Sequence, residues 1–263
     1  IMLLVVDVGN TNTVFAIYKA STILGQWRCS TDTNRTADEY FIWLKGLTDY
    51  NKINLKIVQD MIISAVVPQV EFNLRVMSNR YFDTRPLVVG KPDCRIPIEI
   101  RVDKGVQVGA DRIVNSVGAF NKYGGDLVVI DFGTATTFDI IDYDGAYIGG
   151  VISPGVDLSL STLYRSAAAL PYVNISRPKN IIGKNTRHCM QSGIFWGYVS
   201  LIEGIIKRIN SETGKTLKTI ATGGLSTLFG NDINIFEKVD LNLTLSGLVD
   251  IYKFNKKDSD NEQ

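Results

Sequence analysis

Apolar and polar residues alternate in blocks along the first third of the chain. Apolar runs from Leu3 to Asp7 and from Thr13 to Tyr18 predict two strands joined by a tight turn. Met61–Val67 predicts a further buried strand, and apolar positions at helical spacing predict helices from Thr36 to about Tyr50 and over Val70–Phe82. Strands that alternate with helices in this way predict an α/β fold.

Polar residues of the kind that cap helices mark several predicted helix starts. Thr36 and Glu39 have the spacing of a capping box. Ser153-Pro154 has the pattern of a cap followed by a first helical residue, and Thr186 is the predicted N-cap of a long apolar helix. These signals predict where three helices begin.

Two more helices are predicted, from about Gly109 to Lys122 and from Leu241 to Phe254. The stretch 85–108 contains three prolines and has little periodicity. It is expected to be a surface connection.

The pattern at the start of the chain recurs half a chain later. Residues 127–141 align without a gap with residues 3–17, and both segments hold an apolar strand, then Asp-x-Gly, then small polar residues and a second strand. The identical pairs are Leu3/Leu127, Val5/Val129, Asp7/Asp131, Gly9/Gly133, Thr13/Thr137 and Ile17/Ile141. This internal repeat predicts two similar α/β halves, residues 1–116 and 117–254, followed by a polar tail, residues 255–263.

The formal charge is close to zero, since 28 Lys and Arg residues oppose 27 Asp and Glu residues, giving 28 − 27 = +1. A chain that is 45% apolar and 21% charged is typical of globular proteins, and its charge gives no support for a nucleic-acid partner. Three widely spaced cysteines favour a reducing compartment. No segment is predicted to span a membrane, and the opening run Ile1–Val6 is too short for a signal peptide, so a cytoplasmic location is expected.

The repeated turn has the residues that a phosphate group needs. Gly9 permits close approach of the backbone, and the polar residues after it supply amide and hydroxyl donors, while Asp7 is suited to hold a hydrated Mg²⁺. The second turn, 133–137, repeats this chemistry, and Thr222-Gly223-Gly224 follows a later strand as a third candidate contact. No P-loop and no Gly-x-Gly-x-x-Gly motif occurs. The candidate phosphate-binding residues are Asp7, Gly9, Asn10, Thr11, Asn12 and Thr13 in the first turn, and Gly133, Thr134, Ala135, Thr136 and Thr137 in the second.

Most of these features have an ordinary structural interpretation when taken singly. An Asp-x-Gly after a strand is usually only a turn. Three charged residues further along the chain have similarly simple explanations. Asp111 is an acid that would favour the start of a helix, and Arg112 would be a salt-bridge partner. Asp131 could be a second Mg²⁺–water partner that mirrors Asp7. His188 beside Cys189 lacks further ligands at zinc spacing.

Four segments in order resemble the type III pantothenate kinase family. They are Asp7-Val8-Gly9-Asn10-Thr11-Asn12, Gly109-Ala110-Asp111-Arg112, Asp131-Phe132-Gly133-Thr134-Ala135 and Gly149-Gly150-x-Ile152-x-Pro154-Gly155. The resemblance covers roughly residues 2–254. It implies two ribonuclease H-like or actin-like halves with a central cleft, as in actin, sugar kinases and Hsp70 ATPase domains.

The family resemblance implies ATP-dependent phosphorylation of pantothenate to 4'-phosphopantothenate, the first step of coenzyme A biosynthesis. It implies that Asp7–Val14 forms the ATP phosphate loop, that Thr134 contacts ATP, and that Mg²⁺ is required. Gly109, Ala110, Asp111, Arg112 and Thr186 would contact pantothenate, with Asp111 as proton acceptor. Asp131 would ligate K⁺ or NH₄⁺. The resemblance also implies a homodimer whose pantothenate site lies near the subunit interface.

The chain departs from the family pattern just before Gly109. Val102 and Gly105 stand where the family usually has a Tyr and a Pro. That departure leaves open a kinase for another small hydroxy compound. A nucleotide-binding regulator of the same fold is a second alternative, against which the set Asp7, Asp111, Arg112 and Asp131 argues.

Overall fold

The computed structural model describes residues 2–166, 170–230, 234 and 236–261. The chain divides into two compact units, one formed by residues up to 123 together with those from 242 onward, and one formed by residues 124–241. Each unit contains a five-stranded mixed sheet with helices. The predicted α/β fold with two similar halves is confirmed.

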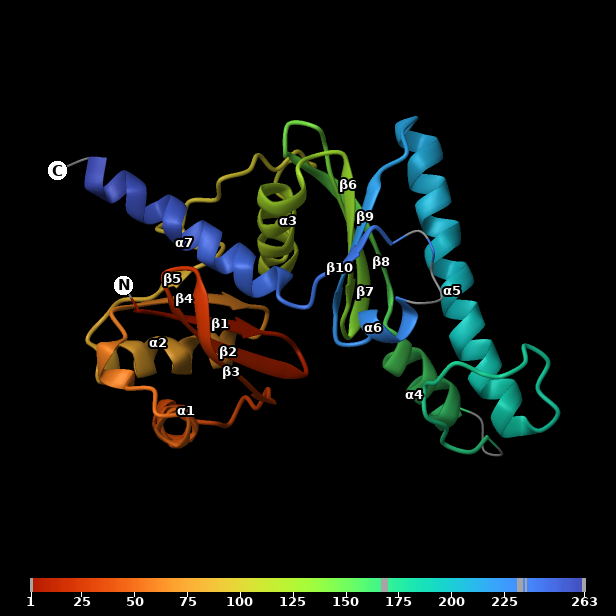
Figure 1. Ribbon diagram of the computed structural model, residues 1–263, viewed down its shortest axis with the longest axis horizontal. Coiled ribbons are helices and arrows are strands. Elements are labelled where there is room, and N and C mark those ends of the chain that lie inside the picture. The colour runs from red at the N-terminus through yellow and green to blue at the C-terminus, as the bar shows by residue number, and fades with distance from the viewer. Residues whose placement is uncertain (1, 167–169, 231–233, 235, 262–263) are drawn as a thin grey trace. The chain divides into compact units, whose positions relative to one another are not determined.

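The first unit is built on a sheet of order β3-β2-β1-β4-β5 (Figure 1). β1 pairs antiparallel with β2 and parallel with β4. The strands are β1 (Met2–Val8), β2 (Asn12–Lys19), β3 (Thr22–Ser30), β4 (Asp60–Ala65) and β5 (Leu87–Val88). The helices are α1 (Ala37–Tyr50), the short 3-10 helix Leu55–Ile57, α2 (Pro68–Phe82), α3 (Ala110–Tyr123) and α7 (Leu243–Asn261).

Both faces of this first sheet are buried, because successive side chains of β1 point to opposite sides. Leu4, Val6 and Val8 pack with α1 and α2, whereas Leu3 and Val5 pack with α3 and α7. A strand that is buried on both faces reads as a continuous apolar run rather than an alternating one. This explains why β1 is apolar at nearly every position.

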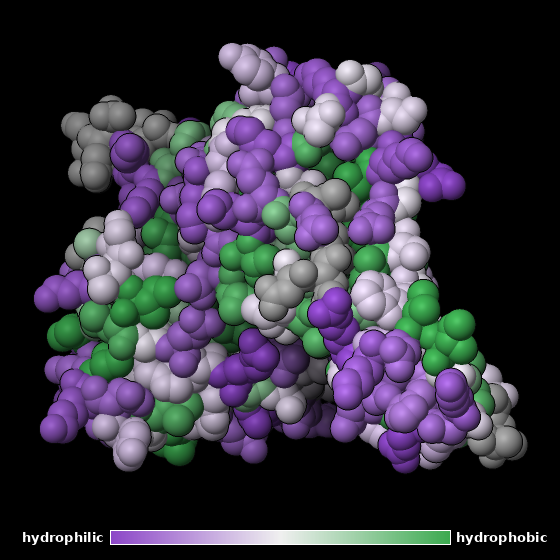
Figure 2. All heavy atoms as spheres, turned by 45° about the vertical axis from the view of Figure 1, so that its right-hand side comes forward, coloured by the Kyte–Doolittle hydropathy of each residue, from purple (hydrophilic) through white to green (hydrophobic). Residues whose placement is uncertain are grey.

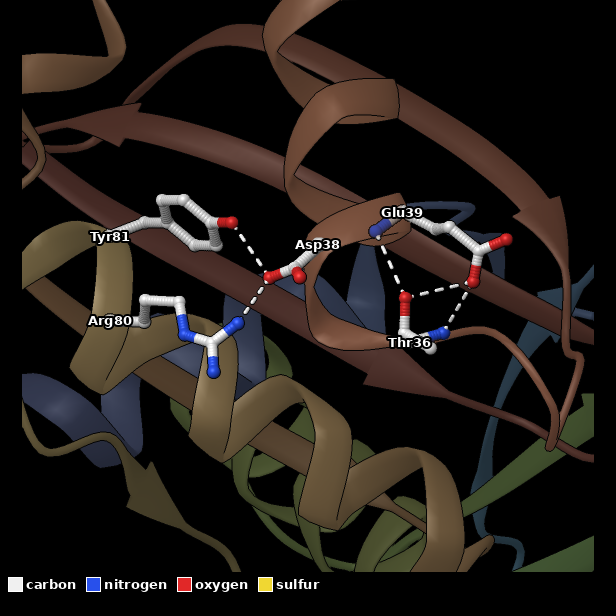
Figure 3. Close-up of polar contacts among 5 residues, drawn as sticks. All are labelled: Thr36, Asp38, Glu39, Arg80 and Tyr81. Atoms are coloured by element: carbon white, nitrogen blue, oxygen red, sulfur yellow. Dashed lines mark hydrogen bonds and ion pairs between the residues drawn. The ribbon is translucent and has the colours of Figure 1, made fainter.

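The capping box predicted for α1 is confirmed (Figure 3). The Thr36 amide donates to Glu39 Oε2 at 2.7 Å, and the Glu39 amide donates to Thr36 Oγ1 at 3.3 Å. In the same turn, Asp38 Oδ1 accepts from Arg80 Nη1 at 2.6 Å and from the Tyr81 hydroxyl at 2.7 Å. The first turn of α1 is therefore fixed both by its own cap and by α2.

The second unit repeats the topology of the first. Its sheet has the order β10-β9-β6-β7-β8, with β6 antiparallel to β7 and parallel to β9, as β1 is to β2 and β4. The elements are β6 (Leu127–Phe132), β7 (Ala135–Ile141), β8 (Tyr147–Pro154), α4 (Val156–Ser166), α5 (Thr186–Thr213), β9 (Lys218–Gly223), α6 (Ser226–Phe229) and β10 (Lys238–Val239). β1 corresponds to β6 and β2 to β7, as the sequence repeat requires.

The two structural units differ from the predicted division in the placement of α3 and α7. The predicted boundary at residue 116 falls inside α3, and α7 returns to the first unit instead of ending the second. A side chain on Gly118 would place its Cβ 2.8 Å from Leu243 O, and one on Gly247 would place it 2.1 Å from Val114 O. Two glycines therefore let the backbones of α3 and α7 approach closely.

Polar contacts also bind α7 to the first unit. Thr244 Oγ1 donates to Asn115 Oδ1 at 2.7 Å, and the Tyr252 hydroxyl donates to Asp60 Oδ2 at 2.6 Å. α7 continues to Asn261, so most of the predicted tail 255–263 is helical, while residues 262–263 lie outside the described part. The helix predicted over 241–254 is therefore present and extends further than its apolar pattern indicated.

Two helix starts were wrongly predicted. Ser153 and Pro154 belong to the end of β8, and α4 begins only at Val156. Asn185, not Thr186, is the N-cap of α5, because Asn185 Oδ1 accepts from the His188 amide at 3.0 Å. Within the described residues, no helix combines the length and apolar character that a bilayer span requires.

Candidate active site

The turn between β1 and β2 is rigidly held. The Gly9 amide donates to Asn12 O at 3.0 Å, and a Cβ on Gly9 would lie 3.2 Å from that oxygen. Thr31 Oγ1 donates to Gly9 O at 2.7 Å and lies 2.9 Å from Thr13 Oγ1. Asn10, like Thr11 and Asn12, is exposed. The turn thus presents polar atoms outward while β2 and β3 fix its backbone.

The corresponding turn of the second unit, between β6 and β7, is held in a similar way. The Gly133 amide donates to Ala135 O at 3.0 Å, and the Gly155 amide donates to Thr134 O at 3.0 Å. A Cβ on Gly155 would lie 2.3 Å from Thr134 O, so this position needs glycine. Thr134 is exposed.

Tyr198 of α5 connects this second turn to the end of β8. Its hydroxyl donates to Pro154 O, so it accepts from Thr136 Oγ1, which lies 2.9 Å away. Burial raises the pKa of Tyr198, which keeps the phenol protonated as a donor at neutral pH. This link between Tyr198 and the turn was not predicted from the sequence.

Asp7 and Asp131 occupy equivalent places near the carboxyl ends of β1 and β6. Asp7 pairs in register with Ser64 of β4, and Asp131 pairs with Thr222 of β9. Both aspartates are half-buried. Gly223 has a φ of +89°, and a Cβ there would lie 2.6 Å from Asp131 Oδ1. Gly223 therefore leaves room for the Asp131 carboxylate, a role that the sequence alone did not reveal.

Asp139 is a buried carboxylate that sequence reasoning passed over. Its side chain is fully buried (0% exposed) on β7. Thr137 Oγ1 donates to Asp139 Oδ2 at 3.0 Å, and the Tyr147 hydroxyl donates to Oδ1 at 3.1 Å. Thr137 is also the register partner of Asp131. The signal that was available is an acidic residue within the otherwise apolar stretch 138–141.

Asp111 lies in the first turn of α3. The Ile113 amide donates to Gly109 O at 3.1 Å, and the Arg112 amide donates to Asp111 Oδ1 at 2.9 Å. A Cβ on Gly109 would lie 2.7 Å from Asp111 Oδ1, so glycine leaves room for the carboxylate. The positive end of the helix dipole favours a negative charge at this place. The helix-start role is therefore present, and it also orients a carboxylate that is half-exposed.

Thr186 is exposed at the first residue of α5, next to the Asn185 cap. His188 Nδ1 lies 3.1 Å from Asn185 Nδ2. In the part of the chain that the structure describes, no group of three or more His, Cys, Asp or Glu residues is placed to hold a metal ion by side chains alone.

The predicted site residues are divided between the two units. Asp7 to Val14 and Gly109 to Arg112 belong to the first unit, and Asp131, Thr134 and Thr186 belong to the second. The phosphate turn Asp7–Val14 and the predicted substrate segment thus share one unit. On this sheet the face that bears Asp7 continues the Leu3 and Val5 side, which α3 covers.

The departure from the family pattern has a conformational counterpart. Gly105 has a φ of +83° in an exposed turn, in which the Val106 amide donates to Asp103 O at 3.2 Å. Proline fixes φ near −65°, so it does not fit this backbone. A proline at position 105 would therefore require a different backbone conformation in this segment.

The duplicated sheet with an aspartate and a glycine turn at the same place in each copy defines the actin-like class of two-unit proteins, to which sugar kinases belong. Among solved structures, a protein of Campylobacter jejuni assigned to the Baf family of transcriptional activators aligns with a TM-score of 0.61 at 20% identity, covering 97% of this chain and 99% of that chain. A candidate 2-dehydro-3-deoxygalactonokinase of Sinorhizobium meliloti aligns with a TM-score of 0.59 at 13% identity, covering 96% of each chain. At these identities the likenesses show the fold alone.

Comparison of sequences identifies the family. The model of type III pantothenate kinases matches residues 3–208. Type III pantothenate kinases of Ruegeria sp. and Roseobacter denitrificans are 56% and 54% identical to this chain; each match covers 97% of this chain and 98% or 99% of the relative. The chain belongs to the type III pantothenate kinase family, which confirms the resemblance drawn from its motifs.

Proposed function

We propose that the protein transfers the γ-phosphate of ATP to the primary hydroxyl of pantothenate, the first step toward coenzyme A. The observation that carries this proposal is the identity of 56% with a type III pantothenate kinase over 97% of the chain. Two further features of the structure support the proposal: two glycine turns with exposed donors, and the Asp111 carboxylate, which accepts from the Arg112 amide at the start of α3. The solved proteins of Campylobacter jejuni and Sinorhizobium meliloti are only 20% and 13% identical to this chain, so neither favours a regulator over a kinase.

The chemistry of phosphoryl transfer is mainly positioning and neutralisation of charge. Asn10, Thr11 and Asn12 offer the phosphates exposed amide and hydroxyl donors, and Thr134 offers another from the second unit. Asp111 accepts the proton of the attacking hydroxyl and orients that group. Arg112 suits the pantothenate carboxylate, because a guanidinium matches a carboxylate with two parallel hydrogen bonds. Gly109, Ala110 and Thr186 complete the proposed contacts with pantothenate.

The cations have separate proposed positions. The carboxylate of Asp7 and the buried hydroxyl of Ser64, its partner on β4, suit a hydrated Mg²⁺. When bound, this cation would neutralise charge on the phosphates. Asp131, beside Thr222 and Gly223, has an oxygen-rich setting that suits K⁺ or NH₄⁺. Mg²⁺ at both aspartates is the alternative for Asp131.

A substrate panel tests the proposal directly. ADP release is followed with Mg²⁺ and K⁺ over pantothenate, other hydroxy acids and sugars. Pantothenate should give the highest kcat/KM. A higher value for another alcohol would support a kinase for another small hydroxy compound. It would also indicate that the altered segment 102–105 determines which substrate is bound.

We predict that activity depends on the monovalent cation through Asp131. K⁺ or NH₄⁺ should support turnover at least tenfold better than Na⁺, and Asp131→Asn should reduce this difference, because the carboxylate charge is lost. Rates are compared at fixed ionic strength. Asp144→Asn, an exposed acid in the β7–β8 turn, is the control. Equal rates in all three salts would contradict a selective site.

We also propose a homodimer with the pantothenate site near the subunit interface. The second unit exposes apolar side chains that suit such an interface, and Figure 2 shows hydrophobic residues in groups on the surface. The exposed apolar side chains of the second unit include Ile152, Leu158, Leu163, Tyr164, Tyr172, Ile181 and Ile182. Sedimentation should give twice the chain mass, and Ile182→Glu should lower that mass; a wild-type monomer would contradict the proposal.

A cytoplasmic location is proposed as well, supported by Cys29, Cys94 and Cys189, which are all free thiols. Burial raises the pKa of Cys94 to about 11, so this thiol is protected from oxidation. A charge of +1 supports no nucleic-acid partner, and no membrane partner is proposed.

A further inference from the structure

Ser64 is a fully buried serine (0% exposed) near the carboxyl end of β4. No group in the described part of the chain forms a hydrogen bond with its hydroxyl. A buried hydroxyl without a partner is destabilising, and native proteins rarely tolerate one without a bound water, ion or ligand. This hydroxyl therefore calls for a partner that is not part of the polypeptide.

The register of the sheet places Ser64 beside Asp7. β1 and β4 are parallel neighbours, and Asp7 pairs directly with Ser64. Residues paired across parallel strands project from the same face of a sheet. One step earlier on that face, Val5 and Ile62 form part of the apolar core beneath α3. The polar pair Asp7–Ser64 thus ends an otherwise apolar face at the edge where the phosphate turn begins.

The second unit has the same arrangement. Asp131 pairs in register with Thr222, which is also buried, on the parallel strand β9. The repeat in the sequence does not reveal this match, because β4 and β9 lie at different separations from β1 and β6. Each aspartate therefore has a hydroxyl residue beside it on the neighbouring strand, a feature of the duplicated unit and not of one half.

We propose that Ser64 is a positioning residue for the Mg²⁺–nucleotide complex, its hydroxyl forming a hydrogen bond with the hydration shell of the cation that Asp7 attracts. This inference rests on the proposed role of Asp7. Small hard cations keep most of their water, and a hydroxyl that both donates and accepts is suited to hold one such water. The unpaired hydroxyl is then satisfied only when the cation and nucleotide are bound.

Calorimetric titration with a non-hydrolysable ATP analogue, with and without Mg²⁺, tests this inference. Ser64→Ala should weaken binding about tenfold in Mg²⁺ and leave binding without Mg²⁺ unchanged. The unliganded variant should melt at the wild-type temperature or above, because a buried unpaired hydroxyl has been removed. Ser64→Cys, which fills the same space but donates weakly, should bind the complex as poorly as Ser64→Ala.

Ser78→Ala is the matched control. Ser78 is equally buried in the same unit, but its hydroxyl donates to Thr84 O at 2.8 Å. This variant should melt at a lower temperature and bind the analogue normally.

If Ser64→Ala behaves like Ser78→Ala, or loses affinity equally with and without Mg²⁺, the inference is overturned. Asp7→Asn separates the two claims: loss of the Mg²⁺ effect in Asp7→Asn but not in Ser64→Ala overturns the role of Ser64 alone. No Mg²⁺-dependent binding by the wild type would overturn the proposed function itself.

Discussion

Asp111→Asn should lower kcat by about 10²–10⁴-fold and leave ATP affinity nearly unchanged. The amide has the shape of the carboxylate and can still accept from the Arg112 amide, so the start of α3 is preserved. It does not accept the proton of the attacking hydroxyl. Steady-state kinetics with pantothenate, together with nucleotide titration, measures the two effects separately.

The control for this variant is Asp144→Asn, which neutralises an exposed acid in the β7–β8 turn. It should retain wild-type kcat. Turnover of Asp111→Asn within a factor of a few of wild type would remove Asp111 from the role of proton acceptor and leave it as a helix-start acid only.

Gly247→Ala should lower the free energy of unfolding by about 2–3 kcal/mol, the largest loss of stability among the variants considered. The new Cβ would lie 2.1 Å from Val114 O, a backbone atom, so α7 must move away from α3. The same movement would strain the Thr244–Asn115 hydrogen bond. Thermal unfolding followed by circular dichroism should show a melting temperature lower by about 5–10 °C.

Gly46→Ala provides the matched control, since it makes the same change in α1, where a Cβ would meet nothing within 4 Å. Alanine is a better helix former than glycine, so this variant should be more stable by about 0.5–1 kcal/mol. Equal melting temperatures for the two variants would show that α3 and α7 do not pack as described.

The repeat made most of the fold predictable from the sequence. Residues 3–17 and 127–141 have the same alternation of apolar strand, Asp-x-Gly and second strand, and local chemistry decides these elements. The capping box at Thr36 was predictable for the same reason, because its partners are three residues apart. Family resemblance rested on four such local segments.

What the sequence did not predict depends on contacts between distant segments. α7 belongs to the first unit because Gly247 meets Val114 and Tyr252 meets Asp60, pairs that are far apart in sequence. Thr31 and Ser64 reach the phosphate turn only through strand pairing. The helix starts at Ser153 and Thr186 were wrong because sheet pairing extends β8 through Pro154 and because Asn185 supplies the cap.

The fate of the γ-phosphate tests the central claim most directly. The purified protein is incubated with pantothenate, Mg²⁺, K⁺ and ATP that carries an isotopic label in its γ-phosphate, and the products are analysed by mass spectrometry. The account predicts one labelled 4'-phosphopantothenate for each ADP formed. ADP that appears with labelled inorganic phosphate alone, or at a rate independent of pantothenate, would contradict it.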